Sequence, residues 1–231
     1  MGDYVMHNLF PIPVGIKNLG EESRTLNKQI MEEIYRIKDL EELNTRSGKN
    51  LFQTKANLQK TNDFFSNLNI IFFEHIKPYL LTAGITDPDN SLELDSLWFN
   101  YNNNPSAYHI PHIHGSGNTL FSCVYYPSSG ILDGKELSDN QNLDENVKLE
   151  SKTNIVPGSI VFLDPSFVAK NLVYIEGMKR RPYYIQQLTL EPRAGILVSF
   201  PQYLPHYVVP TERNNFERVS VVFSVNKKQH K

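Results

Sequence analysis

Cysteine is nearly absent from this chain. Its 231 residues include only Cys123, so an intramolecular disulfide is excluded. Cys123 lies in the apolar run 120–126, where a small buried side chain is more common than a nucleophile. The chain has no excess of basic residues either. It contains 23 Lys and Arg residues and 25 Asp and Glu residues, so the net charge is −2. The composition therefore gives no clear signal for a nucleic-acid partner.

Long hydrophobic runs are also lacking. No stretch approaches the roughly 18 consecutive apolar residues of a membrane span. The N-terminus has neither the basic segment nor the apolar run of a signal peptide. These absences predict a cytoplasmic protein with no membrane partner. Barrels and sandwiches of β-strands commonly reach this length as one domain, so we expect a single domain over residues 1–231.

Two amphipathic patterns in the first part of the chain predict helices. In residues 21–38, and again in residues 64–81, apolar side chains recur at steps of three and four residues. Residues 44–61 between them are polar, and we expect an irregular segment there. Residues 1–95 are therefore interpreted as an N-terminal segment with supporting helices.

From Ser96 onward the sequence changes to short runs of β-branched and aromatic residues separated by Asn, Gly, Pro and Asp. Many short strands after a few helices predict a mainly β fold, a jelly-roll or double-stranded β-helix, with its core in residues 96–231. The expected strands are residues 97–101, 119–126, 160–163, 183–190, 196–200 and 218–225.

Three of the seven histidines lie within six residues, at positions 109, 112 and 114. His112 and His114 are two residues apart, so on an extended backbone both imidazoles point to the same side and can bind one metal ion. His109 is three residues from His112, so on a regular strand it would face the other way. His206, in a proline-flanked segment that resembles a turn, is the candidate for a third ligand from a distant part of the chain.

A cation follows His206 along the chain. Arg218 and Ser220 also share one strand face, and they offer a planar guanidinium and a hydroxyl to an anionic carboxylate. An arginine on the core side of a strand is costly unless it is paired. Together with a redox-metal site, this arrangement predicts an oxygenase that binds an acidic co-substrate.

The order His-x-His, a remote His and, twelve residues later, Arg-x-Ser resembles the iron(II) and 2-oxoglutarate-dependent oxygenases, whose fold is the double-stranded β-helix. Residues 122–126 also resemble a strand of the prolyl 4-hydroxylases. Similarity to one 2-oxoglutarate oxygenase family of bacteria and phages covers nearly the whole chain, with segments 9–13, 98–101, 108–114, 122–126, 162–165 and 195–201. For a phage-encoded member the compartment would be the host cytoplasm.

The resemblance implies a role for each candidate residue. Catalytic Fe(II) would be bound by His112, His114 and His206. The co-substrate 2-oxoglutarate would be held through its distal carboxylate by Arg218, Ser220 and Tyr126. With O2 as the second co-substrate, the implied enzyme is a dioxygenase, a hydroxylase that couples 2-oxoglutarate decarboxylation to oxidation of a C–H bond.

One position departs from the common pattern of the superfamily. Most members have His-x-Asp or His-x-Glu, whereas position 114 is a histidine. Three outcomes are compatible with the sequence. The site is a working three-histidine iron centre, which the narrower family favours; or a carboxylate from Asp164 or Asp133 completes it; or it binds a metal without oxygenating anything.

Two other functions are compatible with the same residues. A cupin-like metalloenzyme that does not use 2-oxoglutarate also builds three-histidine sites from His-x-His, although no glutamate follows His114 at the short spacing common in cupins. The other is a non-catalytic metal-binding β-domain. The sequence does not determine the oligomeric state or the substrate, which could be an amino acid, a peptide or a metabolite, because specificity lies in loops.

Overall fold

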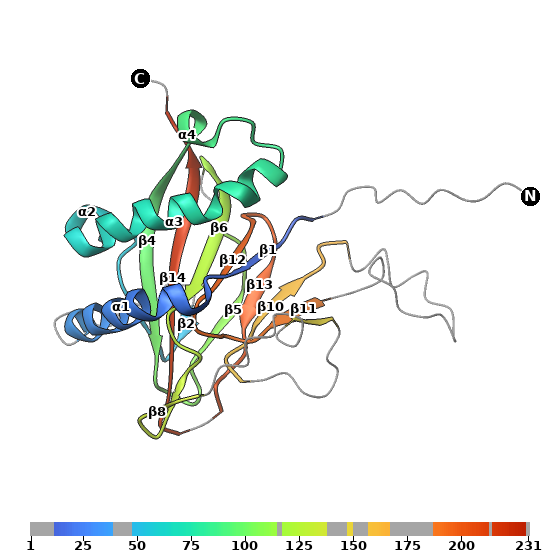
Figure 1. Cartoon of the computed structure of the whole chain (residues 1–231). Helices are drawn as coiled ribbons and strands as arrows, with labels where there is room; N and C mark the ends of the chain where they lie inside the picture. Colours follow the sequence, from blue (N-terminus) through green and yellow to red (C-terminus); the bar gives the residue numbers. More distant parts are fainter. Residues whose placement is uncertain are drawn as a thin grey trace, which may run out of the picture.

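The computed structural model describes residues 12–38, 48–114, 117–137, 147–149, 157–166, 187–212 and 214–229. Within them, two antiparallel sheets face each other, and helices cover the outer face of the larger sheet (Figure 1). Apolar side chains from both sheets meet between them, and a second apolar layer lies under the helices. The fold therefore has three layers, with the inter-sheet layer in the position where a site can form.

The larger sheet has its longest strands in the middle, where β14 (Phe216–Lys227) lies between β6 (Thr119–Tyr126) and β4 (Leu92–Asn102). The outer strands are short, and a hairpin of two-residue strands pairs with the beginning of β14. These shorter strands are β1 (Gly15–Asn18), β12 (Ile196–Pro201), β3 (Phe52–Gln53), β7 (Ile131–Leu132) and β8 (Lys135–Glu136).

The smaller sheet has the strand order β2-β5-β13-β10-β11-β9. Its strands are short and all its pairs are antiparallel. Their bounds are β2 (Gly48–Lys49), β5 (Tyr108–His112), β13 (His206–Val208), β10 (Ile160–Leu163), β11 (Gln187–Leu190) and β9 (Val147–Leu149).

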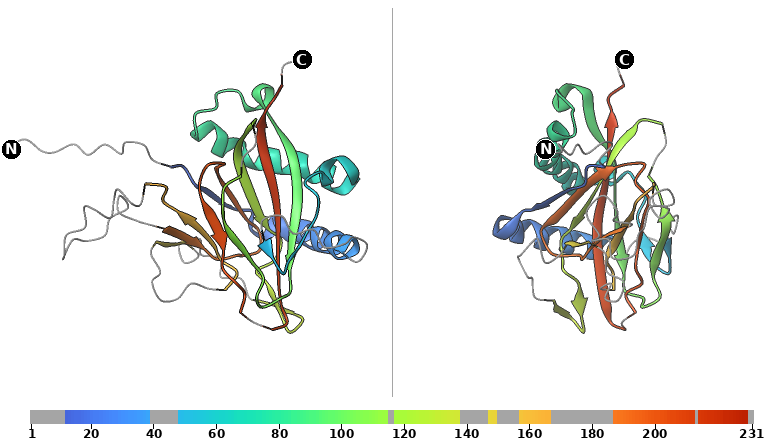
Figure 2. Two further views of the ribbon diagram at one scale, coloured as in Figure 1. Left: turned by 180° about the vertical axis from the view of Figure 1, so that it is seen from behind. Right: turned by 90° about the vertical axis from the view of Figure 1, so that its right-hand side faces the viewer.

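Two long helices, α1 (Ser23–Lys38) and α3 (Asp63–Thr82), lie on one side of the larger sheet (Figure 2). A one-turn 3-10 helix, η1 (Gly20–Glu22), precedes α1, and the four-residue helices α2 (Leu58–Thr61) and α4 (Pro88–Ser91) flank α3. The side chain of Asn62 caps α3 by accepting a hydrogen bond from the backbone N–H of Phe65 at 3.2 Å. Both predicted helices are thus confirmed to within two residues at each end.

Strand alternation divides β14 between the two apolar layers. Val219, Val221 and Phe223 point into the layer under the helices. Arg218 and Ser220 point the other way, toward the smaller sheet. One strand therefore anchors the helices and presents polar groups to the inter-sheet space.

All six predicted strands have a counterpart in the structure, and most of the strands that were not predicted are short. Strands 119–126 and 160–163 have the predicted bounds, and those near 97–101, 196–200 and 218–225 are longer than predicted. Residues 187–190 form a strand as predicted, while 183–186 lie outside the described residues.

The prediction of an irregular segment at 44–61 is wrong for its described part, which contains β2, β3 and α2. Residues 44–47 lie outside the described residues. The first 95 residues also contribute β1 and the first residues of β4 to the larger sheet. Two-residue strands have no periodicity to detect, because they are defined only by a partner far away in the sequence.

No helix of the described ranges combines the length and the apolar character needed to cross a membrane.

Phe72 of α3 is fully buried and joins the helix to the sheet. Its ring stacks on Phe223 of β14 at a centroid distance of 4.9 Å and lies 4.9 Å from the ring of Tyr125. Replacing Phe72 with Ala should lower the free energy of unfolding by about 3–5 kcal/mol, measured by urea titration. Ile70→Ala is the matched control, because Ile70 is 64% exposed on the same helix and its loss should cost less than about 0.5 kcal/mol. Equal effects of both changes would contradict this packing.

Candidate metal centre and co-substrate pocket

Two strands of the smaller sheet bring distant histidines together. β5 pairs with β13, and His112 lies directly opposite His206 in this pairing. His206 faces the larger sheet, where its ring packs against Phe200 of β12 at a centroid distance of 4.9 Å. His114 follows β5, and its backbone N–H donates to the carbonyl oxygen of Gln202 at 3.1 Å. That hydrogen bond holds the third imidazole beside the other two.

The prediction that His109 faces away from this site is wrong. His109 pairs with Val208 and His112 pairs with His206, so three steps along β5 match two steps along β13. The extra residue makes a β-bulge at 110–111, where both side chains are exposed. The bulge brings His109 into the same cavity as His112, with only 7% of His109 exposed. The prediction assumed an unbroken strand.

His206 lies in a strand, not in the turn that its flanking prolines suggested. β13 pairs with β5 on one side and with β10 on the other, where Phe162 is the partner of His206. Pro205 takes part in the sheet through its carbonyl oxygen, which accepts from the N–H of Leu163 at 2.8 Å. A proline at the beginning of a strand is compatible with pairing because only its N–H is missing.

The three histidines that the sequence singles out form one cluster. One ligand nitrogen from each of His112, His114 and His206 lies within 4.8 Å of the other two. The Nε2 atoms of His114 and His206 are 3.0 Å apart. Two nitrogens that each lie about 2.1 Å from one ion, at a right angle, have about the same separation. The donor set and its spacing therefore fit a divalent transition metal.

Main-chain carbonyl groups determine the tautomers of two of these rings. Nδ1 of His112 lies 2.7 Å from the carbonyl oxygen of Ile110, and Nδ1 of His206 lies 2.9 Å from that of Leu204. A carbonyl oxygen only accepts, so each Nδ1 carries the proton and donates it. In the neutral rings Nε2 is then unprotonated, and its lone pair is available to a metal ion.

Burial favours the neutral form of all three imidazoles. Desolvation is the main cause that lowers the pKa of His114 to about 2 and the pKa of His206 to about 4, and nearby histidines add to both effects. Desolvation also lowers the pKa of His112, against a smaller raising effect of the Ile110 carbonyl. A metal binds only the unprotonated ring, so these histidines are in the ligating form at neutral pH.

Trp98, the only tryptophan of the chain, borders this cluster. Its ring stacks on His114, with centroids 5.7 Å apart and an interplanar angle of 25°. Trp98 comes from β4 of the larger sheet, where it lies opposite Val222 of β14. The cluster is thus enclosed by an aromatic side chain that the spacing of the histidines could not have indicated.

Arg218 lies on the larger sheet and is 3% exposed. Its Nε donates to the carbonyl oxygen of Gly158 at 2.7 Å. Nη1 and Nη2 make only long hydrogen bonds, at 3.4 Å to the hydroxyl of Ser220 and at 3.3 Å to the hydroxyl of Tyr126. No carboxylate of the described residues pairs with this buried cation. A buried guanidinium without an anion suits a site that receives one.

Gly158 is required for this position of Arg218. It has φ +83°, a conformation that side chains with a Cβ rarely adopt. A Cβ at this residue would lie 3.1 Å from Cδ of Arg218, closer than ordinary contact. The glycine lets the backbone approach the arginine and turn a carbonyl group toward Nε.

One cavity between the sheets is lined by both groups of residues. His112, His114 and His206 line it together with Arg218, Ser220 and Tyr126. Val124, Ile160 and Val222 add apolar surface to its wall. The structure therefore brings together all six residues singled out in the sequence. His109, Asn100 and Trp98 also line the cavity, and they were missed as site residues because their position depends on strand register.

The two aspartates considered as completing carboxylates do not join the cluster. Asp133 lies in the turn between β7 and β8, where its Oδ1 accepts from the side chain of Asn215 at 3.1 Å. Oδ1 of Asp164 accepts from the backbone N–H and the hydroxyl of Ser166 at 2.9 and 2.7 Å. Among the described residues, the cluster therefore consists of histidines alone.

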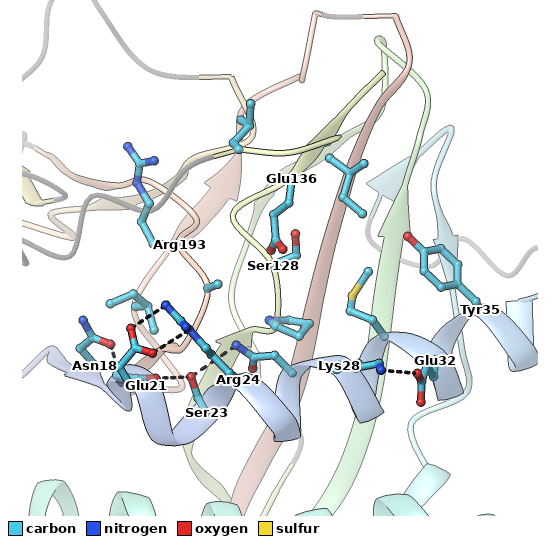
Figure 3. A pocket seen from close by; sticks show the side chains of 18 residues that line it. Asn18, Glu21, Ser23, Arg24, Lys28, Glu32, Tyr35, Ser128, Glu136 and Arg193 are labelled. Atoms are coloured by element: carbon cyan, nitrogen blue, oxygen red, sulfur yellow. Dashed lines mark hydrogen bonds and ion pairs between the residues drawn. The ribbon is translucent and has the colours of Figure 1, made fainter. Parts of the chain in front are cut away.

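A larger groove of about 740 Å³ lies beside α1, on the other side of the larger sheet (Figure 3). It is lined by charged side chains of both signs, and those of the helix are paired as Arg24 with Glu21 and Lys28 with Glu32. The smaller cavity at the histidines is the better candidate for chemistry, because metal-binding groups converge there with a buried guanidinium that no carboxylate of the described residues pairs with.

Comparison with known proteins supports this assignment of the cavity. The family model described as "Putative 2OG-Fe(II) oxygenase" matches residues 96–224, which include all six site residues. No protein with a curated description matches the sequence.

Several solved structures resemble the fold at low sequence identity. A prolyl-4-hydroxylase from Pseudomonas putida has a TM-score of 0.54 and 13% identity, with 94% of each chain covered. The α-ketoglutarate-dependent epimerase SnoN of nogalamycin biosynthesis has a TM-score of 0.59 and 14% identity, covering 93% of this chain and 76% of its own. HygX from Streptomyces hygroscopicus, solved with nickel and 2-oxoglutarate, has a TM-score of 0.55 and 10% identity, with 93% and 83% covered. These likenesses confirm the predicted double-stranded β-helix.

The stacking of Trp98 on His114 gives metal binding an optical signal. A transition-metal ion bound at the three histidines should quench the fluorescence of this indole, because quenching by such ions is strongest at close range. We expect Fe(II) or Co(II), added without oxygen, to lower tryptophan emission with saturation at one ion per chain. Trp98→Phe should bind the metal with no such signal. Unchanged tryptophan emission of the wild type at saturating metal would contradict the assignment of the metal ion to the three histidines beside Trp98.

Proposed function

Since this chain belongs to the 2OG-Fe(II) oxygenase family, an enzyme family that depends on Fe(II) and 2-oxoglutarate, we propose that it is a hydroxylase with a three-histidine iron centre. In this proposal His112, His114 and His206 bind the iron. Arg218, Ser220 and Tyr126 bind the distal carboxylate of 2-oxoglutarate.

The observation that supports the proposal most is the shared cavity. Three imidazoles, two of them with an unprotonated Nε2, line the same space as a buried guanidinium that no carboxylate of the described residues pairs with. A metal site alone does not need the guanidinium, and a carboxylate site alone does not need the imidazoles. A 2-oxo acid with a second carboxylate uses both, one end at the metal and the other at Arg218.

When bound, Fe(II), 2-oxoglutarate and O2 would together supply oxidative decarboxylation, in which 2-oxoglutarate becomes succinate and CO2, one oxygen atom of O2 enters succinate and the other is inserted into a C–H bond of the substrate. The residues of the chain orient these groups. The imidazoles stay neutral, since burial lowers their pKa values, and the Ile110 and Leu204 carbonyls bind Nδ1 of two of them, which would leave Nε2 of these rings for the ion. Val124, Ile160 and Val222 limit the access of water to the space between.

A cupin-like enzyme without 2-oxoglutarate explains the histidines but leaves the buried Arg218 without a function. A non-catalytic metal-binding domain has the same weakness. The two are separated from the proposal by one assay, in which purified protein is supplied with Fe(II), 2-oxoglutarate and O2, and succinate is measured. Succinate formation that depends on both Fe(II) and 2-oxoglutarate supports the oxygenase. Stoichiometric iron without succinate, at any substrate tested, would favour the rivals.

The substrate is proposed only by class, as an amino acid, a peptide or a metabolite with a C–H bond that can reach the metal centre. The similar structures include a prolyl-4-hydroxylase and an epimerase of nogalamycin biosynthesis, so enzymes with this fold differ in what they act on. Substrate choice is therefore not carried over from the fold.

Removal of one metal ligand tests the iron centre. His206→Ala should abolish stoichiometric Fe(II) binding, because two imidazoles remain and no carboxylate of the described residues lies in the cluster. Iron would be quantified after anaerobic loading and gel filtration. His75→Ala is the matched control, since His75 lies on α3 and contacts Lys17 instead of the cluster. Full retention of iron by the His206 variant would refute its role.

Arg218 is tested through co-substrate affinity. Arg218→Ala should raise the Kd for 2-oxoglutarate by about a hundredfold, because two charge-assisted hydrogen bonds are lost. Arg218→Lys should lie in between, since it keeps the charge but loses the planar fork. Affinity would be measured anaerobically from the visible charge-transfer band of the Fe(II) chelate, and iron binding should persist in both variants. An unchanged Kd in either variant counts against the assignment.

A further inference from the structure

Asn100 is a buried side chain of the cavity with an unused hydrogen-bonding atom. It lies on β4 directly opposite Ser220 of β14 and is 5% exposed. Its Nδ2 donates to the hydroxyl oxygen of Ser220 at 3.4 Å, which is a long hydrogen bond. Its Oδ1 is buried and accepts no hydrogen bond from the described part of the chain. Such atoms destabilise a fold, and native proteins keep few of them without a reason.

The neighbouring Asn102 shows how a purely structural asparagine is satisfied on the same face of the same strand. Its Nδ2 donates to the carbonyl oxygen of Ala107 at 3.3 Å, and its Oδ1 accepts from the backbone N–H of Asn104 at 3.2 Å. Both ends of that amide are used by the main chain. Asn100 has no such main-chain partners, so its polar group is not explained by the local fold.

The position of Asn100 along β4 places it beside the space for the co-substrate. Trp98, two residues before it, stacks on His114 at the metal centre. Asn102, two residues after it, lies opposite Arg218. Since two residues of a strand span roughly 6.5–7 Å, Asn100 lies between the row of the metal centre and the row of the guanidinium.

We propose that Asn100 is a further co-substrate-binding residue, whose side-chain amide donates a hydrogen bond to the distal carboxylate of 2-oxoglutarate. This inference rests on the proposed function. Asn100, Ser220 and Arg218 form a chain of polar contacts at 3.4 Å each, so a carboxylate held by the last two lies within reach of the first.

A rotation of the amide makes both of its ends useful. The hydroxyl of Ser220 can donate as well as accept. When the amide of Asn100 turns by half a rotation, Oδ1 accepts from this hydroxyl and the NH2 group points into the cavity. The orphan oxygen then has a donor, and the carboxylate gains an N–H donor without any movement of the backbone.

The test compares two ligands that differ only in the distal carboxylate. Anaerobic Fe(II)-loaded wild type and Asn100→Ala are titrated with 2-oxoglutarate and with 2-oxopentanoate, which has the same five carbons but no second carboxylate. The charge-transfer band of each chelate gives the Kd. We expect Asn100→Ala to raise the Kd for 2-oxoglutarate about tenfold and to leave the Kd for 2-oxopentanoate within twofold.

Two variants sharpen this comparison. Asn100→Asp keeps the shape of the side chain, but its negative charge repels the distal carboxylate. It should therefore raise the Kd for 2-oxoglutarate more than Asn100→Ala does. Asn226→Ala is the matched control, because Asn226 also has a buried Oδ1 that accepts no hydrogen bond from the described residues, and it does not line the cavity. Iron binding, followed by the fluorescence of Trp98, should be unchanged in Asn100→Ala and Asn226→Ala.

The outcomes separate this inference from the proposed function. A wild type that forms no chelate with 2-oxoglutarate would refute the proposed function, and the role of Asn100 with it. A normal wild type together with equal losses for both oxo acids, or with no loss for either, would overturn the role of Asn100 alone. The first of these two results would show an asparagine that only supports the fold.

Discussion

The antiparallel pairing of β5 with β13 is the contact on which the candidate site depends. It places His112 opposite His206. The β-bulge in this pairing directs the side chain of His109 toward the same cavity. His114 and His206, whose Nε2 atoms are 3.0 Å apart, are separated by 92 positions in the sequence. No local segment can hold the three imidazoles together, so the candidate metal centre requires the pairing of β5 with β13. Metal binding should therefore be coupled to the stability of this sheet.

The larger sheet contributes a buried cation, which is unfavourable for folding by itself. Strand alternation makes this arrangement possible, because the outer side chains of β14 are apolar and pack under α1 and α3. The same strand can then hold Arg218 on its inner side, supported by the carbonyl of Gly158. The helical layer thus stabilises a strand whose other face is arranged for binding. Among the described residues, Oδ1 of Asn100 accepts no hydrogen bond, and Nη1 and Nη2 of Arg218 make only long ones, which suits a cavity that an anionic ligand completes.

Sequence reasoning succeeded where a local rule was sufficient. The two-residue period of a strand placed His112 with His114 and Arg218 with Ser220, and it needs no knowledge of partners. It failed for His109, since a bulge is defined by the strand opposite. His206 was taken for a turn residue because a three-residue strand between prolines has no pattern of its own. Trp98 and Asn100 were not recognised, because their place at the site follows from the register of β4 against β14, which is a property of the folded sheet.

The acceptors that orient His112 and His206 are both main-chain carbonyls, each two residues earlier in the same segment. In many metal sites a carboxylate side chain does this work, and one substitution there removes it. Here no exchange of a side chain deletes the acceptor, so the orientation of these rings is robust to most point mutations. Its weakness is conformational. Changes that alter the backbone at residues 110 and 204, such as insertions or a new glycine, would disorder the rings although every candidate ligand remained in the sequence. Inactive variants of this kind would escape notice in any survey that inspects ligand residues alone.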